Sequence, residues 1–342
     1  MDKNLNQAQL VSVVMAVYNG ETYLREAIDS ILNQTFTNFE CIIINDGSKD
    51  KSLSIIKSYS DNRIILINNE VNKGLIYSLN KGIEIAKGEY IARMDADDIC
   101  LPNRFEEQLK AFQAQPNTIV VSSDYYLLNN TKRSLIKTNY TNYALKAILL
   151  FTPCFCHPTV MIKNLFKEKN IFYNQEFIHA EDYKLWIDLA VCGNFYNVPI
   201  PLLKYRSHPT QISTLNKNIQ LQISSTIRKN YLNNLEFNLS TQQFKTLNFI
   251  GNNEFINQKN TLVEIENCLS ELVNQNSNHK KFDTAQFNKV IFKFWLDSCG
   301  YSNLGLTAFK QFFNSNLAYY DKLSLTQKGK FLAKCLIRKF KH

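Results

Sequence analysis

The feature that most constrains the fold is an alternation of short apolar runs with amphipathic helical patterns, from about residue 10 to residue 121. Strands that alternate with helices over such short distances are typical of βαβ units, in which crossover helices make neighbouring strands parallel. Residues 11–17 form a nearly continuous apolar run, as expected for a central strand that is buried on both faces. The sequence therefore predicts an α/β fold with a mainly parallel central sheet flanked by helices.

The individual elements follow from the apolar periodicity. Strands are expected at residues 11–17, 39–44, 64–67, 90–94 and 119–122. Helices are expected at residues 24–32, 52–59 and 75–86, and again after Pro102. Beyond residue 124 the pattern loosens, with strands expected at 159–162 and 202–205 and a helix at 181–191. From about residue 216 the chain is rich in Asn, Gln and Lys with helical periodicity, which predicts two domains, residues 1–214 and a mainly helical, basic domain of residues 215–342.

Composition indicates the class of protein and its expected location. No apolar run approaches the ~18 residues that cross a bilayer. The polar start of the chain lacks the basic and apolar pattern of a leader peptide. Eight cysteines lie mostly within apolar segments, which is typical of buried thiols in a reducing compartment. We therefore expect a cytoplasmic protein.

The net charge of +9 is placed unevenly along the chain. Residues 1–214 carry 22 Lys and Arg against 22 Asp and Glu, so the whole excess lies in residues 215–342. A basic half can bind nucleic acid or acidic lipid. Nucleic acid is disfavoured because every site motif described below lies in the neutral half. Residues 330–342 carry five Lys and Arg between apolar side chains, so this helix either contacts an anionic surface at the inner face of the cytoplasmic membrane or docks on its own domain.

Groups of polar residues stand at the ends of three of the predicted strands, within residues 18–21, 45–48 and 93–98. In an open parallel sheet, ligands bind outside the carboxyl ends of the strands, so a site is expected at these residues. The chain lacks G-x-G-x-x-G after the first strand and G-x-x-x-x-G-K-[ST] anywhere. Dinucleotide oxidoreductases and P-loop enzymes are therefore disfavoured.

Three carboxylates within four residues, Asp95, Asp97 and Asp98, are the most informative of these groups. Such carboxylates repel one another unless a cation lies among them, and Mg2+ or Mn2+ prefers carboxylate oxygens while keeping positions free for phosphate. The favoured interpretation is a divalent ion that bridges a diphosphate, and the alternative is a solvated acidic turn. The Cys154-x-Cys156-His157 cluster has no second ligand pair, so it is a weaker candidate for a metal site.

Five ordered motifs between about residues 10 and 210 resemble those of the family 2 glycosyltransferases, which have the GT-A fold. The motifs are V-S-V-V-M-A-V-Y-N-G-E, I-I-I-N-D-G-S-K-D-K-S, N-K-G-L, A-K-G-E-Y-I-A-R-M-D-A-D-D and H-A-E-D-Y-K-L-W. The resemblance implies a GT-A domain with a C-terminal helical extension. It also implies an enzyme that moves a sugar from a nucleotide diphosphate donor to an acceptor hydroxyl.

The resemblance implies roles for individual residues as well. The implied donor-binding residues are Val17, Tyr18, Glu21, Asp46, Lys73, Arg93 and Asp95. Tyr18 would pack on the nucleobase, and Asp46 would accept a hydrogen bond from the uracil imide, which suggests a UDP-sugar. Asp97 would bind the metal, Mn2+ or Mg2+, with His208 as a further candidate ligand. The Lys and Arg of this set would supply positive charge near the phosphates, because Leu79 stands where many members carry an Arg.

Glu181-Asp182 matches the acidic pair that supplies the base in inverting members of the family. Asp182 would take the proton from the acceptor hydroxyl as that hydroxyl attacks the anomeric carbon. Without the other motifs, an acidic first turn of a helix would be an equal interpretation. The implied function is an inverting, metal-dependent transferase that builds a bacterial surface polysaccharide such as capsule, lipopolysaccharide or O-antigen, on a saccharide or lipid-linked saccharide acceptor. A nucleotidyltransferase and a non-catalytic nucleotide-sugar binding module are the alternatives.

Overall fold

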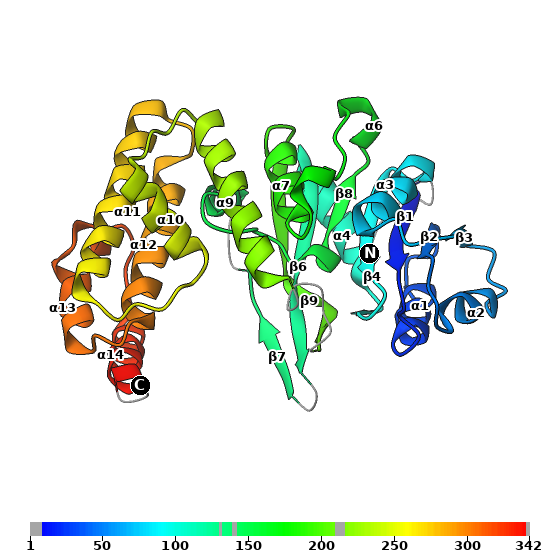
Figure 1. The fold of residues 1–342 in the computed structure, drawn as a ribbon, viewed down its shortest axis with the longest axis horizontal. Helices are drawn as coiled ribbons and strands as arrows, with labels where there is room; N and C mark the ends of the chain where they lie inside the picture. The colour runs from blue at the N-terminus through cyan, green and yellow to red at the C-terminus, as the bar shows by residue number, and fades with distance from the viewer. Residues whose placement is uncertain (1–8, 130–131, 139–141, 209–215, 340–342) are drawn as a thin grey trace. The chain divides into compact units, whose positions relative to one another are not determined.

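The computed structural model describes residues 9–129, 132–138, 142–208 and 216–339 (Figure 1). The chain divides into two compact units. The first unit consists of Met1–Asn142 and Phe155–Gln220, and the second consists of Tyr143–Cys154 and Leu221–His342. The division into domains at residue 214 stays a prediction.

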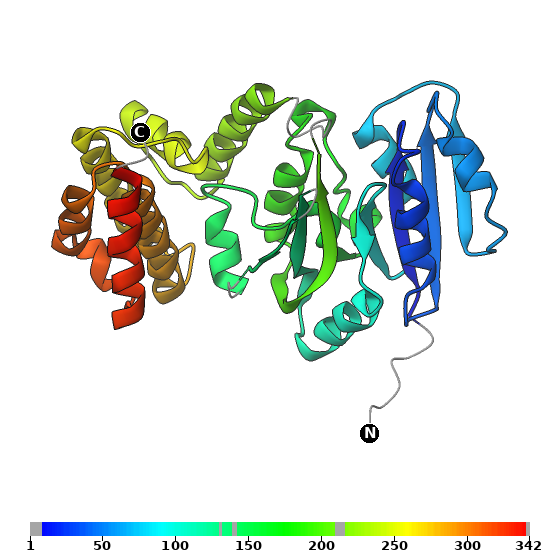
Figure 2. The same cartoon turned by 90° about the horizontal axis from the view of Figure 1, so that it is seen from below.

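Within the described residues, nine strands form one sheet in the order β3-β2-β1-β4-β8-β6-β9-β5, with β7 paired to β6. Figure 2 shows the first unit from below, with the earlier strands in blue and the later strands in green. Their bounds are β1 Val11–Val17, β2 Phe39–Asp46, β3 Ile64–Asn69, β4 Tyr90–Asp95, β5 Ile99–Cys100, β6 Thr118–Asn129, β7 Lys132–Ile136, β8 Met161–Lys163 and β9 Asn194–Ser207. Neighbours among β3, β2, β1 and β4 are parallel. The predicted α/β fold with a mainly parallel sheet is therefore confirmed.

Helices cover both faces of β1, because its side chains alternate between two layers. The helices of the first unit are α1 Leu24–Leu32, α2 Ser52–Lys57, α3 Leu75–Ile85, α4 Arg104–Ala114, α6 Phe166–Lys169 and α7 Glu181–Ala190. Val13 and Met15 belong to one apolar cluster with residues of α1 and α4. Val14 faces α3 on the other side of the sheet. The helix packs against β1 at Gly82, where an added Cβ would lie only 2.5 Å from Val14 Cγ1. A strand between two helix layers is expected to be almost wholly apolar, which explains the nearly continuous run at residues 11–17. Its one polar side chain, Ser12, is buried and donates to Glu40 Oε1 at 2.5 Å.

The sheet changes direction after β4. β8 runs antiparallel to β4 and β6, whereas β6 pairs in parallel with β9. Residue 159, predicted to begin a strand, ends a short 3-10 turn at His157–Thr159, and β8 begins at Met161. β6 extends beyond the predicted strand through half-buried positions up to Asn129, and β9 begins before the predicted strand, at Asn194, in a stretch where buried and exposed positions mix. Such stretches do not need a continuous apolar sequence, so the apolar pattern did not mark them.

The second unit is helical. It contains all but the first residues of α5 Asn142–Ile148 and α9 Lys217–Asn234, together with α10 Thr241–Gly251, α11 Lys259–His279, α12 Thr284–Tyr301, α13 Leu306–Asn314 and α14 Leu325–Lys339. Arg228 of α9 is buried, and its Nε donates to the carbonyl oxygen of Phe151 at 2.7 Å. Its Nη1 donates to Oδ1 of Asn248 at 2.9 Å and of Asn252 at 3.0 Å. This arginine ties the segment at residues 143–154 to the C-terminal helices.

The basic helix α14 packs apolar side chains against the second unit. Phe331 and Cys335 are buried, and the Phe331 ring lies 4.9 Å from the Phe312 ring between centroids. The Lys334 ammonium lies 3.6 Å from the centre of the Tyr301 ring. These contacts support a helix docked on its own unit, and contact with an anionic membrane stays a prediction. Among the described helices, none combines the length and the apolar character that crossing a bilayer requires.

Replacing Arg228 by Ala should destabilise the second unit, because the buried carbonyl oxygen of Phe151 and two partly buried asparagine oxygens lose their donor. We expect a loss of roughly 2–4 kcal/mol in the free energy of unfolding. Urea denaturation followed by far-UV circular dichroism measures this loss. Lys229→Ala is the matched control, since Lys229 is exposed on the same helix. Equal stability of the two variants would contradict the anchoring role of Arg228.

Candidate active site

The loops at the carboxyl ends of β1 and β2 hold each other by reciprocal hydrogen bonds. The N–H of Asn19 donates to Ser48 Oγ at 3.0 Å, and the N–H of Lys49 donates to Asn19 Oδ1 at 2.8 Å. The Glu21 carboxylate accepts from the N–H of Lys51 at 2.9 Å. Glu21 therefore fixes the loop in this structure, and its predicted contact with the donor nucleotide stays a prediction.

Three of the predicted donor-binding residues, Val17, Tyr18 and Lys73, have different surroundings in the structure. Val17 is 1% exposed, so its side chain belongs to the core and only its backbone borders the loop. Tyr18 is 52% exposed, which leaves an aromatic ring free of the core at the end of β1. The Lys73 ammonium lies 4.6 Å from the centre of the Tyr77 ring. Of the three, Tyr18 presents the surface that stacking on a base requires.

The Asp46 carboxylate is held at the end of β2 by three donors. Oδ1 accepts from Asn69 Nδ2 at 2.8 Å and from the N–H of Lys73 at 2.9 Å, and Oδ2 accepts from the N–H of Gly74 at 2.8 Å. Gly47 follows with φ 68°, and a Cβ there would lie 2.5 Å from a backbone carbon of the loop after β3. Among the described residues Oδ2 has this one donor, so a lone pair remains for a ligand.

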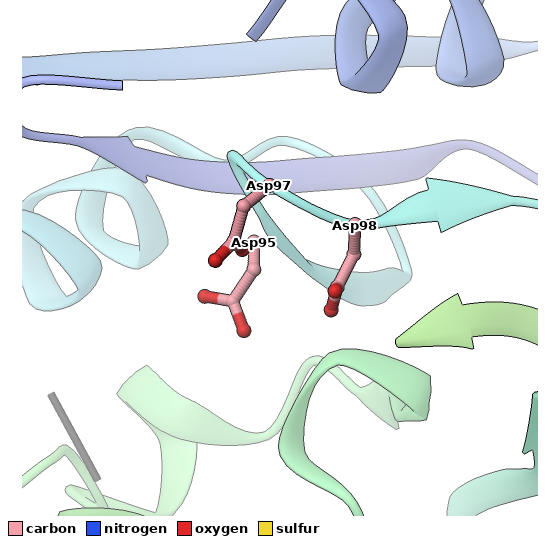
Figure 3. A group of neighbouring side chains, drawn as sticks. All are labelled: Asp95, Asp97 and Asp98. Carbon is pink, nitrogen blue, oxygen red and sulfur yellow. The ribbon is translucent and has the colours of Figure 1, made fainter. Parts of the chain in front are cut away.

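Asp95, Asp97 and Asp98 come together where β4 ends and the chain turns towards β5 (Figure 3). One carboxylate oxygen of each lies within 4.8 Å of the others, and we call these three residues the acidic turn. Arg93 forms an ion pair with Asp95, and His208 Nε2 lies 2.9 Å from Asp97 Oδ2. The structure thus brings together four residues that the sequence predicted for donor or metal binding.

Burial and the repulsion of neighbouring carboxylates disfavour the charged forms of Asp95 and Asp98. Burial raises the pKa of Asp98 well above its ordinary range, and the charges of Asp95 and Asp97 raise it further. Burial also raises the pKa of Asp95, although the charge of Arg93 opposes this. A divalent cation would relieve the repulsion, and carboxylate oxygens are the donors that Mg2+ and Mn2+ prefer. The residues present therefore fit such an ion.

Glu181 and Asp182 form the first turn of α7, where the helix dipole favours negative charge. Burial and the neighbouring Asp182 raise the pKa of Glu181 to about 7. Burial raises the pKa of Asp182, Arg93 lowers it, and Asp95 raises it further. The acidic pair of α7 therefore lies within electrostatic reach of the acidic turn.

Comparison with known proteins identifies the family. Residues 12–170 match the family model described as Glycosyl transferase family 2. A glycosyltransferase of Haemophilus influenzae is 34% identical over 248 residues, which cover 68% of this chain and 77% of that protein. The chain belongs to glycosyl transferase family 2. The predicted enzyme class, a glycosyltransferase, is thereby confirmed.

Further relatives of this glycosyltransferase agree with the family and the fold. The O-antigen biosynthesis glycosyltransferase WbnJ of Escherichia coli is 37% identical over 221 residues, covering 62% of this chain and 86% of that protein. S. aureus TarS in complex with UDP-GlcNAc superposes with a TM-score of 0.53 at 15% identity, over 96% of this chain and 88% of that one. The mannosyltransferase PcManGT of Pyrobaculum calidifontis, in complex with GDP-Man and Mn2+, gives a TM-score of 0.53 at 14% identity, over 97% and 87%. These structures confirm the GT-A fold.

Sequence reasoning missed a hydrogen-bonded pair in this glycosyltransferase, His157 and Tyr173. His157 Nε2 lies 2.7 Å from the Tyr173 hydroxyl. Asn80 holds the backbone of Tyr173 in both directions, donating to its carbonyl oxygen at 2.8 Å and accepting from its N–H at 3.0 Å. Burial lowers the pKa of His157 well below its ordinary range, and the charge of Arg93 lowers it further, so the imidazole is neutral at pH 7. The Cys-His-Pro segment was the one sequence signal for this pair.

The raised pKa of Glu181 predicts how stability depends on pH in the absence of metal. A carboxyl whose folded pKa is about 7 against an ordinary 4.5 binds its proton more tightly when folded, so its stabilising effect is complete below pH 4.5 and lost as the pH rises through 7. Glu181→Gln should therefore be more stable than the wild type at pH 8, by roughly 2–4 kcal/mol, and equally stable near pH 4.5.

Urea denaturation in EDTA at both pH values checks this prediction. Glu176→Gln is the matched control, because Glu176 is an exposed glutamate just before the same helix. If the stability difference between Glu181→Gln and the wild type is the same at pH 4.5 and at pH 8, the burial of Glu181 does not disfavour its charged form, and the prediction is wrong.

Proposed function

We propose that this protein is an inverting glycosyltransferase that moves a sugar from a UDP-sugar to an acceptor hydroxyl with the help of Mn2+ or Mg2+. The observation that carries the proposal is the acidic turn, which lies within electrostatic reach of a buried second acidic pair on α7. One group of carboxylates suits a metal-bound diphosphate, and the other suits proton removal from the acceptor. A site for binding alone has no use for the second group.

The donor nucleotide would bind at the ends of β1 and β2. The exposed Tyr18 ring offers a stacking surface, and Asp46 Oδ2 keeps a lone pair for the imide N–H of uracil. Val17, Glu21, Lys73 and Arg93 complete the proposed donor-binding set with Asp95, which would face the ribose or sugar. TarS has been solved with UDP-GlcNAc, which supports a UDP-sugar donor. PcManGT has been solved with GDP-Man, so GDP is the nucleotide to compare with UDP in a binding test.

The acidic turn would hold the divalent ion through Asp97, with His208 as a further ligand. His208 Nε2 lies 2.9 Å from Asp97 Oδ2, so the two atoms are close enough for both to bind the same ion after a small shift of the side chains. A bound ion would compensate the charge that develops on the departing diphosphate. Arg93, paired with Asp95 in the structure, would keep a positive charge beside the phosphates.

Asp182 would act as the general base. It would accept the proton of the acceptor hydroxyl while the acceptor oxygen bonds to the anomeric carbon and the bond from that carbon to the diphosphate oxygen breaks. Attack from the face opposite the leaving group inverts the anomeric centre. Because burial raises the pKa of Asp182, the rate of transfer should rise with pH as this base loses its proton.

The biological setting is proposed from the relatives. WbnJ is an O-antigen biosynthesis enzyme, which supports a role in bacterial surface polysaccharides such as capsule, lipopolysaccharide or O-antigen. We propose residues 1–214 as the catalytic domain and residues 215–342 as a basic, mainly helical domain. The acceptor would be a saccharide or lipid-linked saccharide, met in the cytoplasm at the inner face of the membrane.

Asp97→Ala should abolish the effect of Mn2+ on UDP binding, because the proposed main metal ligand is lost. Isothermal titration calorimetry with UDP, with and without Mn2+, measures this on the wild type and the variant. Glu84→Ala is the control, since Glu84 is a surface carboxylate paired with Lys81 on α3. Binding of GDP but not UDP by the wild type would contradict the UDP assignment, and a full Mn2+ effect in Asp97→Ala would contradict the metal assignment.

Asp182→Asn should stop transfer while sparing UDP binding, because the amide keeps the shape of the side chain but cannot take a proton. We expect turnover to fall by about 100-fold or more. The assay is UDP release from UDP-glucose, UDP-galactose or UDP-GlcNAc in the presence of Mn2+. Asp188→Asn is the control, since Asp188 lies on the same helix in an ion pair with Lys184. Wild-type turnover in Asp182→Asn would refute its role as the base.

A further inference from the structure

Arg206, near the end of β9, joins three segments that lie far apart in the sequence. Its backbone N–H donates to Asp98 Oδ1 at 2.8 Å, and its Nε donates to the carbonyl oxygen of Asp97 at 2.8 Å. Its Nη2 donates to Glu26 Oε2 of α1 at 2.6 Å, and the guanidinium carbon lies 4.2 Å from the centre of the Tyr23 ring. One residue thereby ties the acidic turn to the start of α1.

The contact with the Asp97 carbonyl bears directly on the proposed metal ligand. The peptide that carries this oxygen sets the direction in which the Asp97 side chain leaves the backbone. His208 lies two residues after Arg206 and brings Nε2 to within 2.9 Å of Asp97 Oδ2. A single stretch of β9 and the residue after it therefore orient both the carboxylate and its imidazole partner.

An arginine suits this task better than a lysine. Its planar guanidinium presents donors in two directions at fixed geometry, so Nε can hold the turn while Nη2 holds α1. Glu26 is 57% exposed, so the ion pair itself contributes little stability. Its main effect is geometric, because it restrains the guanidinium that restrains the turn. Such support is what keeps closely spaced ligands at the separation that a cation requires.

We infer that Arg206 is a positioning residue that sets the affinity of the acidic turn for the divalent cation and, through it, for the donor diphosphate. The inference rests on the proposed function, since it assumes that Asp97 binds the metal. Groups that orient metal ligands typically change metal affinity by 10–100-fold when they are removed. Arg206→Ala should therefore raise the Mn2+ concentration needed for half-maximal UDP binding roughly 10-fold. UDP affinity without Mn2+ should stay unchanged, because Tyr18 and Asp46 are untouched.

The test is calorimetric UDP binding at graded Mn2+ concentrations, with the full chain as wild type, Arg206→Ala and Arg206→Lys. The lysine variant should behave like the alanine variant, because one ammonium cannot hold both partners. The matched control is Arg63→Ala. Arg63 forms an ion pair with Asp61, donates to the carbonyl oxygen of Leu32 at 3.1 Å, and lies 4.3 Å from the centre of the Phe39 ring. It thus has the same types of contact as Arg206, away from the acidic turn.

A raised Mn2+ requirement in the Arg206 variants, with none in Arg63→Ala, would support the positioning role. An unchanged requirement in Arg206→Ala, or an equal rise in Arg63→Ala, would overturn it. If Arg206→Ala does not fold, as judged by thermal unfolding, Arg206→Lys carries the same comparison. If UDP binding by the wild type does not depend on Mn2+, the metal-dependent function on which the inference rests is refuted instead. Failure of the proposed function is therefore distinguishable from failure of the positioning role.

Discussion

The site depends on the repulsion within the acidic turn, where three carboxylates lie within 4.8 Å of one another. Such an arrangement persists only where other groups restrain or neutralise it. Arg93 comes from the preceding strand, but His208 and Arg206 come from the far end of β9, more than 100 residues later in the chain. β5 follows the turn directly and pairs with β9. The turn is therefore complete only when β9 has returned across the sheet.

The antiparallel strand β8, which lies between β4 and β6, also holds the strand that leads into the acidic turn. Val160, just before β8, accepts the N–H of Arg93 at 3.1 Å. Arg104 of α4 is fully buried, and its Nη2 donates to the carbonyl oxygens of both Arg93 (2.8 Å) and Val160 (3.0 Å). This fixes the 3-10 turn that carries His157 beside the end of β4. The antiparallel strand thus brings the His157–Tyr173 pair close to the strand that ends in the acidic turn.

The parts that the sequence predicted are those whose signals are local. A window of a few residues is enough to recognise the apolar run at residues 11–17, the helical periodicities that follow it and the spacing of Asp95 and Asp97. The parts that it missed depend on distant partners. Among the described strands, β7 pairs with β6 alone, and it carries mostly exposed residues, so no apolar pattern marks it. The contacts of Arg206 with the Asp97 carbonyl and of Asn80 with Tyr173 span 109 and 93 residues, which no local window contains.

Arg93 links the two acidic groups electrostatically. Its positive charge lowers the pKa of Asp182, while the negative charge of Asp95 raises it. Burial is the largest influence and keeps the pKa of Asp182 raised whether or not a cation is bound. If a cation compensates Asp95, as the proposed metal-bound donor would, the contribution of Asp95 to this raised pKa fades, while the lowering effect of Arg93 remains. Asp182 would then lose its proton more readily once the donor is in place. Binding of the metal and donor would thus favour the form of Asp182 that can accept a proton, because Arg93 and Asp95 act on both acidic groups.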